Sequence, residues 1–279
     1  MQSPSPASRP ALTDRTALAR HRMRAVRTGM ADVLHRIAAD EIHDRLAEIN
    51  RTFTDIAVVS GFPDLWSALL PGARSIADDD ILVLAPGSLD LVVHAMALHW
   101  ADDPVGQIVQ CARALRPDGL FLAILPAGQT LHELRAVMAQ AESEITGGLS
   151  PRVLPMGDLR DLGGLLARGA LALPVADILP VPASYRNLIH LAQDLRAMGE
   201  QNALAGRLRR PTDRAVFARA AGLYAERFPD ASEPARIQAS FELAFLTGWA
   251  PSDSQPKPLR PGSAKMALAD ALNQIGKTP

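Results

Sequence analysis

The sequence has a single cysteine, Cys111, among its 279 residues, and aromatic residues make up only 4% of it. One cysteine allows no disulfide within the chain and no zinc site built from a cysteine cluster. The longest apolar runs, at 81–85 and 120–125, fall well short of the roughly 18 residues that a membrane-spanning helix needs. A net charge of −1 gives no reason to expect a polyanionic partner. We therefore expect a chain that folds in a reducing compartment without inserting into a membrane.

Lysine is absent before Lys257, so arginine carries almost all of the positive charge. The first 29 residues hold several arginines and one acidic residue, Asp14, a composition that mitochondrial presequences share. Because the residues after position 12 also have the spacing of a native helix, we favour a folded helix over a cleaved leader. A second basic cluster, later in the chain, consists of Arg207, Arg209 and Arg210. It is either solvated surface or a surface that binds an acidic protein.

The first half of the chain alternates between helical and strand-like patterns. Helical spacing predicts one or two helices over 13–50, and β-branched and apolar runs predict buried strands separated by helices. Uninterrupted apolar strands alternating with amphipathic helices are typical of a parallel sheet covered on both faces. The chain is therefore predicted to have an α/β fold. The strands are expected at 53–59, 81–84, 89–93 and 120–125, and the helices between them at 64–70 and 104–115.

The second half of the chain is mostly helical in pattern, and the helical block at 185–227 is expected to cap the carboxyl edge of the sheet. Residues 237–245 alternate between apolar and polar side chains, which predicts an antiparallel closing strand. The expected division is a flexible tail at 1–12, a helical segment at 13–50, an α/β core at 51–184, a cap at 185–230, a closing strand at 231–250, and a proline-rich tail with a short helix at 251–279.

Few residues stand in patterns that carry chemistry. His99 and Trp100 follow an apolar strand, and open α/β sheets bind ligands at that edge, so the pair either lines a ligand cleft or is kept for packing. His94 and Cys111 are expected to be core residues. The seven histidines are scattered and predict no iron site, and the chain has neither a nucleophile elbow nor a P-loop. No catalytic residue and no metal ligand is predicted.

Four longer motifs, together with shorter ones, resemble a known family. The motifs are Leu-His-Trp-Ala-Asp-Asp at 98–103, Arg-Pro-Asp-Gly at 116–119, Gly-Gly-Leu-Ser-Pro at 147–151 and Asp-Leu-Arg-Ala-Met-Gly-Glu at 194–200. They resemble class I S-adenosylmethionine (SAM) methyltransferases, and within these the branch of the mitochondrial complex I assembly factor, a methyltransferase-like protein. The resemblance implies a Rossmann-like sheet, SAM as the cofactor, and a complex I subunit as the protein partner.

The loop that should hold the cofactor departs from this family. The family pattern after the first strand is an acidic residue followed by three alternating glycines, which let backbone amides approach the cofactor. Here two expected glycine positions carry Val59 and Pro63, and no carboxylate ends the strand. A valine resists positive φ, and proline has no amide hydrogen. We therefore expect SAM not to bind, with a residual cleft at His99 and Trp100. The degenerate loop consists of Val59, Ser60, Gly61, Phe62 and Pro63.

A second departure is a shortening of the sheet between its first and fourth strands, because only about thirty residues separate Val59 from Leu89. In the family, an acidic residue closing the second strand binds the ribose. The segment 78–80 is Asp-Asp-Asp, but it precedes the strand expected at 81–84 and is predicted to be a solvated loop. Losing two charge-assisted contacts, at about 1.5–3 kcal/mol each, would weaken a micromolar ligand to millimolar or worse.

Three functions remain open on the sequence. The favoured one is a pseudoenzyme that acts by protein binding, as an accessory or assembly subunit that contacts the peripheral arm of respiratory complex I. The second is an active SAM-dependent methyltransferase or arginine hydroxylase acting on a complex I subunit. The third is a sensor of a small molecule. The resemblance implies a cytoplasmic location at the inner membrane of a bacterium or, alternatively, the mitochondrial matrix.

Overall fold

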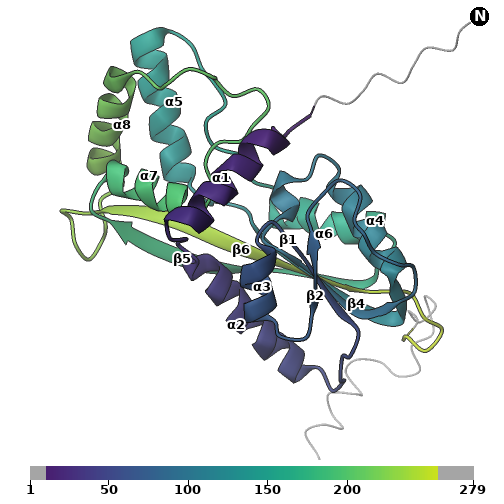
Figure 1. Ribbon diagram of the computed structural model, residues 1–279. Helices are drawn as coiled ribbons and strands as arrows, with labels where there is room; N and C mark the ends of the chain where they lie inside the picture. Colours follow the sequence, from purple (N-terminus) through teal and green to yellow (C-terminus); the bar gives the residue numbers. More distant parts are fainter. Residues whose placement is uncertain (1–10, 257–279) are drawn as a thin grey trace, which may run out of the picture.

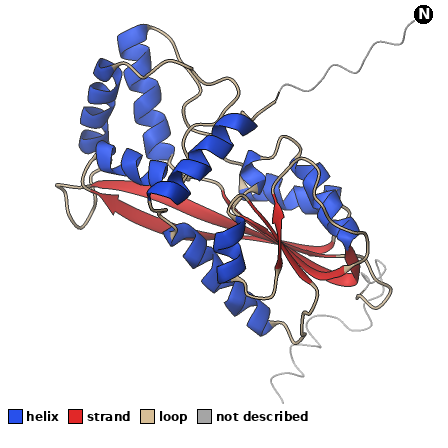
Figure 2. Ribbon diagram, viewed as in Figure 1, coloured by secondary structure: helices blue, strands red, loops and turns tan. Residues whose placement is uncertain are grey.

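The computed structural model describes residues 11–256, so most of the expected tail at 1–12 and most of the expected tail at 251–279 lie outside the described residues. The described chain forms a six-stranded sheet with helices on both faces, and the strand order is β2-β1-β3-β4-β6-β5 (Figures 1 and 2). The strands are β1 (Ile56–Ser60), β2 (Arg74–Ala77), β3 (Leu89–Ala95), β4 (Leu115–Pro126), β5 (Ala172–Tyr185) and β6 (Ile237–Trp249). The helices are α1 (Arg15–Thr28), α2 (Val33–Glu48), α3 (Pro63–Leu69), η1 (Leu98–Trp100), α4 (Pro104–Ala114), α5 (His132–Thr146), α6 (Leu159–Arg168), α7 (Leu188–Ala197) and α8 (Arg214–Arg227).

Strands β2, β1, β3 and β4 are parallel, whereas β6 is antiparallel to both of its neighbours. Successive strand residues point to opposite faces, and both faces of this sheet are apolar. Val58 and Val93 pack toward α2 and α3, whereas Val59 and Val92 pack toward α4 and α6. The α/β prediction is confirmed, and so is the antiparallel closing strand, which is β6.

The second strand lies earlier in the chain than the sequence predicted. β2 ends at Ala77, and the segment 81–84 is a loop in which Ile81 and Val83 are exposed. The prediction was wrong because alternate residues of this apolar run face solvent and no neighbouring strand pairs with them. Only Leu82 is buried. The correction matters for the site. An acidic residue, Asp78, does directly follow the second strand, and it is buried rather than solvated.

Strand β5 had no counterpart in the sequence prediction. It contains Pro174, Pro180 and Pro182, and proline argues against a central strand because it lacks a ladder amide. The structure accommodates these prolines because β5 is the edge strand and pairs with β6 alone.

The cap is built on the part of the β5–β6 pair that extends beyond the parallel strands (Figure 1). Helices α5, α7 and α8 bury an apolar cluster against this extension, with Tyr185, Tyr224 and Phe241 in it. The cap thus includes α5 in addition to the expected helices from 185–230. Helix α1 lies between the cap and the core, packs against α7 and places its residues near both (Figure 1). Within residues 11–256, no helix is both long enough and apolar enough to cross a membrane.

Candidate functional site

A cavity of about 870 Å³ lies between the cap and the carboxyl edge of the sheet, and we call it the cap cavity. Met96 and Pro126 reach it from the ends of β3 and β4. The opposite wall comes from the cap helices, with Met138 of α5, Leu195 of α7 and Phe217 of α8. Its volume is in the range of small-molecule sites, and its position is where open α/β sheets bind ligands.

His99 and Trp100 contact the cap cavity and share one carboxylate partner, Glu200. The His99 Nε2 lies 3.2 Å from Glu200 Oε2, and the Trp100 indole donates to the same oxygen at 2.6 Å. Burial by itself raises the pKa of Glu200, but the hydrogen bond and charge of His99, together with Arg22, hold that pKa at about 2. Glu200 is therefore ionised at neutral pH.

The other ring nitrogen of His99, Nδ1, has no hydrogen-bond partner, although the side chain is only 5% exposed. Because Nε2 faces the Glu200 carboxylate, Nδ1 is the ring nitrogen left for another partner, as an acceptor in a neutral ring or as a donor in an imidazolium. Buried polar atoms without a partner are rare in folded proteins. His21 also lines the cap cavity, and its Nδ1 atom has no hydrogen-bond partner either, so the walls leave two ring nitrogens unsatisfied.

Arginines line the exposed part of the cap cavity. We call Arg207, Arg209 and Arg210 the arginine rim; all three line the cavity, and the last two are exposed. Asp14 pairs with Arg207 at 2.9 Å and with Arg209 at 3.4 Å, whereas Arg210 has no carboxylate partner in residues 11–256. Two of the three arginines therefore share one carboxylate and the third has none, so the rim keeps an excess of positive charge.

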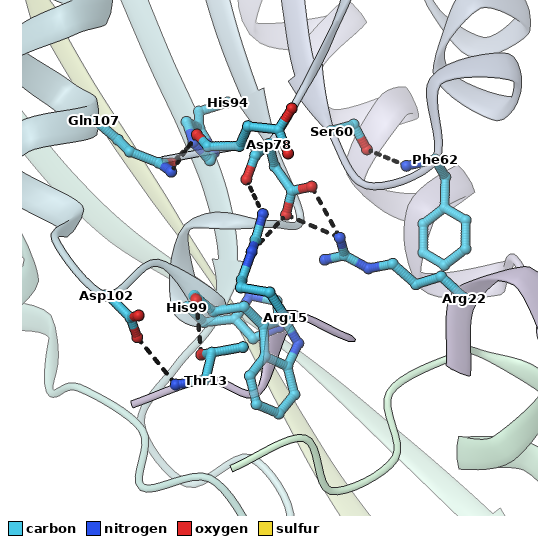
Figure 3. A network of polar contacts seen from close by, with 12 residues as sticks. Thr13, Arg15, Arg22, Ser60, Phe62, Asp78, His94, His99, Asp102 and Gln107 are labelled. Atoms are coloured by element: carbon cyan, nitrogen blue, oxygen red, sulfur yellow. Dashed lines mark hydrogen bonds and ion pairs between the residues drawn. The ribbon is translucent and has the colours of Figure 1, made fainter. Parts of the chain in front are cut away.

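The loop after β1 lies against an arginine side chain from α1. Arg22 reaches it from α1, and a side chain added to Gly61 would overlap the Arg22 guanidinium. The Arg22 Nη1 lies 2.9 Å from both carboxylate oxygens of Asp78, and Arg15 contacts the same residue (Figure 3). The Arg22 guanidinium thus occupies the space directly against Gly61. A cavity of about 630 Å³ lies beside it, and Gly61, Pro63, Asp78 and Arg22 are among the residues that line it.

The backbone of this loop offers few donors to a ligand. The Phe62 amide donates to Ser60 Oγ at 3.2 Å, and Pro63, which begins α3, has no amide hydrogen. Val59 is fully buried within β1, and no residue from 59 to 63 has a positive φ. Helix α3 has seven residues, so its amino end is also short. The glycine-rich geometry that cradles a cofactor in the family is not formed here.

The structure places the other residues considered from the sequence in structural roles. His94 is fully buried and bonds to Gln107 at 2.7 Å, and burial lowers its pKa to about 4. Cys111 is buried, which raises the pKa of its thiol. Asp102 accepts from the backbone amides of residues 12 and 13. Among the described residues, no group of three histidine, cysteine or carboxylate side chains is arranged to hold a metal ion.

Sequence reasoning missed Arg22 and Glu200. Arg22 is one of several arginines in α1, and only the packing of that helix distinguishes it from the others. Glu200 ends the motif at 194–200, but its partners lie about a hundred residues earlier in the chain. The motifs at 98–103 and 194–200 were both noted in the sequence, but neither indicated that Glu200 would pair with His99 and Trp100.

Residues 64–123 match the family model described as a methyltransferase domain. The chain is 34% identical over 208 residues to "Arginine-hydroxylase NDUFAF5, mitochondrial" of Danio rerio, which covers 75% of this chain and 64% of that protein. It is 38% identical over 193 residues to the protein of the same name in Dictyostelium discoideum, covering 69% of this chain and 44% of that protein.

A malonyl-[acyl-carrier protein] O-methyltransferase of Laribacter hongkongensis is 34% identical over 176 residues, covering 63% of this chain and 56% of that protein. The chain thus spans less than two thirds of the length of these curated relatives. A solved structure of a putative methyltransferase from Bacillus halodurans superposes with a TM-score of 0.47 at 10% identity, covering 75% of this chain and 97% of that chain. The chain is thus similar to a methyltransferase domain over residues 64–123, and to the curated relatives over 63–75% of its own length.

Proposed function

We propose that this chain works by binding a protein, as an accessory or assembly subunit for the peripheral arm of respiratory complex I, and that it does not transfer methyl groups. The motifs that resemble the assembly-factor branch support the partner, as does the similarity to proteins named arginine-hydroxylase NDUFAF5. The word mitochondrial in those names favours the matrix as its location, with the inner face of a bacterial inner membrane as the other setting.

The observation that carries the proposal is the contact of Arg22 with Gly61. A ligand held by the loop after β1 would need the space that the Arg22 guanidinium fills. Moving Arg22 away would leave Asp78 buried with only a longer contact to Arg15, at 3.5 Å. Breaking a buried ion pair by removing one partner costs about 3–5 kcal/mol. The binding free energy of a weakly held cofactor is too small to offset this cost.

The shortage of backbone amide donors in this loop also supports the proposed loss of the cofactor. Pro63 has no amide hydrogen, and the amide of Phe62 already has a partner in Ser60. A ligand carboxylate would therefore find few free amides, and only a short helix, at this position. SAM is the cofactor that the fold implies, and the residues of this loop do not fit it.

The partner surface that we propose consists of the cap helices α7 and α8 with the arginine rim. The rim has more positive than negative charge, so it suits an acidic patch on the partner. We add to this surface the proline-rich tail expected at 251–279, most of which lies outside the described residues.

The first experiment is a calorimetric titration of the folded chain with SAM up to millimolar concentration. We expect no binding heat, whereas the Laribacter relative serves as a positive control because its name states a methyltransferase activity. A dissociation constant in the micromolar range would overturn the loss of the cofactor.

The second experiment measures co-purification of tagged chain with complex I subunits, identified by mass spectrometry. Deleting 257–279 leaves every described contact in place, including that of Gln255 with Asp118. We expect the deletion to reduce complex I subunits in the eluate while the melting temperature of the chain stays unchanged. Recovery equal to the full-length chain would remove the tail from the proposed surface, and absence of complex I subunits from both would refute the partner.

A second candidate function is modification of a complex I subunit, by arginine hydroxylation or methylation. The specific observation in its favour is the ionised Glu200 beside the cap cavity, since a carboxylate suits a substrate guanidinium. The test is to incubate purified complex I subunits with the chain and cell extract, and then to measure the masses of the subunits by mass spectrometry. A gain of one oxygen or one methyl group that disappears with Glu200→Gln would favour this function over protein binding alone.

A further inference from the structure

The cap cavity has a polarity gradient along its walls. One part is apolar, with Met138, Leu195 and Phe217 contributed by three different cap helices. The exposed part carries the arginine rim, where the Arg209 side chain is 69% exposed. The buried part holds His99, whose side chain is only 5% exposed. A ligand filling the cavity therefore meets positive charge in the exposed part and an unsatisfied ring nitrogen in the buried part.

We propose that the cap cavity binds an amphiphilic anion: a medium-length aliphatic chain with a carboxylate at the arginine rim and a hydroxyl group at the buried end. The aliphatic chain would replace water along the apolar wall, at about 25 cal/mol for each Å² of apolar surface removed from water. The hydroxyl, which can either donate or accept, would form a hydrogen bond with His99 Nδ1, which has no other partner. This site is separate from the loop after β1.

The sign of the rim selects the ligand head. Asp14 offsets part of the charge of Arg207 and Arg209, but Arg210 has no carboxylate partner in the described chain. A cationic head would be repelled by the rim, and a neutral head would gain nothing from it. The proposal does not depend on the proposed protein partner, because it uses only the walls of the cap cavity.

The test compares three ligands of equal chain length by calorimetry with the full chain, all below their micellar concentrations. The ligands are 10-hydroxydecanoate, decanoate and 1,10-decanediol. We expect 10-hydroxydecanoate to bind best, with each of the other two about fivefold weaker, because each lacks one of the two polar contacts. A diol that binds as tightly as the hydroxy acid would overturn the role of the rim. Equal binding of the two acids would overturn the role of His99.

Substitutions then locate the ligand. Arg209→Gln with Arg210→Gln should weaken both acids about fivefold and leave the diol unchanged. The matched control is Arg160→Gln with Arg168→Gln, which removes the same charge from exposed positions on α6, outside the cap cavity. We expect the control to bind all three ligands as the parent chain does. An equal loss in the control would show that net charge, and not the rim, sets the affinity.

A third variant fills the cavity. Ala192 of α7 lines the cap cavity and is only partly buried, so Ala192→Trp places a large ring there with little change to the core. We expect it to abolish saturable binding of 10-hydroxydecanoate while the circular dichroism spectrum stays that of the parent. Undiminished binding by this folded variant, or no saturable binding by the parent chain, would refute the site.

Discussion

Arg22 and Asp78 form a buried ion pair in which the Arg22 Nη1 lies 2.9 Å from each oxygen of the Asp78 carboxylate. The two side chains are 8% and 9% exposed, and they join α1 to the residue that follows β2 (Figure 3). The Nε and Nη2 atoms of Arg22 have no hydrogen-bond partner. The pair therefore holds an amino-terminal helix over the edge of the sheet while leaving part of the guanidinium unsatisfied.

The first prediction concerns the contact of this guanidinium with Gly61. Gly61→Ala should lower the free energy of unfolding by about 2 kcal/mol, because the new methyl group displaces Arg22 from Asp78. Arg22→Ala should cost about 3 kcal/mol by leaving Asp78 short of a partner. In the Arg22→Ala background, Gly61→Ala should then cost less than about 0.5 kcal/mol, as measured by urea denaturation.

The control for this double-mutant cycle is Gly148→Ala, since a methyl group there meets no atom within 4 Å. It should have the same small effect in both backgrounds. Strict additivity of the Gly61 and Arg22 substitutions would contradict the contact on which the proposed loss of the cofactor depends.

The second prediction is a loss of stability in mild acid, caused by His35 and His94. Burial lowers the pKa of each to about 4, from an unfolded value near 6.5. Both rings are neutral in the fold, so below pH 6.5 the unfolded chain binds protons that the folded chain does not. Their contribution is fully present above pH 6.5 and is lost as the pH falls toward 4, by up to about 1.4 kcal/mol per pH unit for each ring.

Denaturation curves at intervals from pH 7.5 to pH 5 measure this slope above the range in which carboxylates titrate. His94→Gln keeps a hydrogen-bonding side chain opposite Gln107 and should remove up to about half of the slope, because burial also lowers the pKa of His21, which contributes in the same direction. A slope equal to that of the parent chain would contradict the burial-driven shift assigned to His94.

The third prediction separates two ion pairs on the same helix, α5. Glu142 accepts from Arg152 at 2.9 Å and 2.6 Å and from Ser150, and the hydrogen bond from Arg152 is the largest cause that lowers its pKa to about 2. Glu142→Gln should cost about 2 kcal/mol in the free energy of unfolding, because it weakens charge-assisted bonds that hold the segment 147–152 against α5.

Glu144, two residues along the same helix, is the matched control. It pairs with Arg219, and the side chains of Glu144 and Arg219 are 38% and 43% exposed. Glu144→Gln should therefore lower the free energy of unfolding by less than about 1 kcal/mol. Equal losses for the two substitutions would show that burial of the Glu142 pair adds nothing. Urea denaturation at pH 7 measures both.

The sequence predicted the site unevenly. His99 and Trp100 were placed after a strand by their position, and the structure brings both to the cap cavity. The second strand was misplaced because apolar residues at 81–84 suggested burial that only Leu82 has. The acidic residue after β2 was misjudged as a result, since its role depends on which strand it follows.

The sequence by itself determined the alternation of strands and helices, the antiparallel closing strand and the loss of glycines between Val59 and Pro63. These features are local: side-chain periodicity and backbone restrictions act over a few residues. Only the tertiary structure decided that Arg22 lies against Gly61 and that His99 faces Glu200, which are 39 and 101 positions apart. Such contacts depend on how α1 and the cap pack on the sheet, because burial and a shared partner, and not residue type, distinguish one arginine or glutamate from the others.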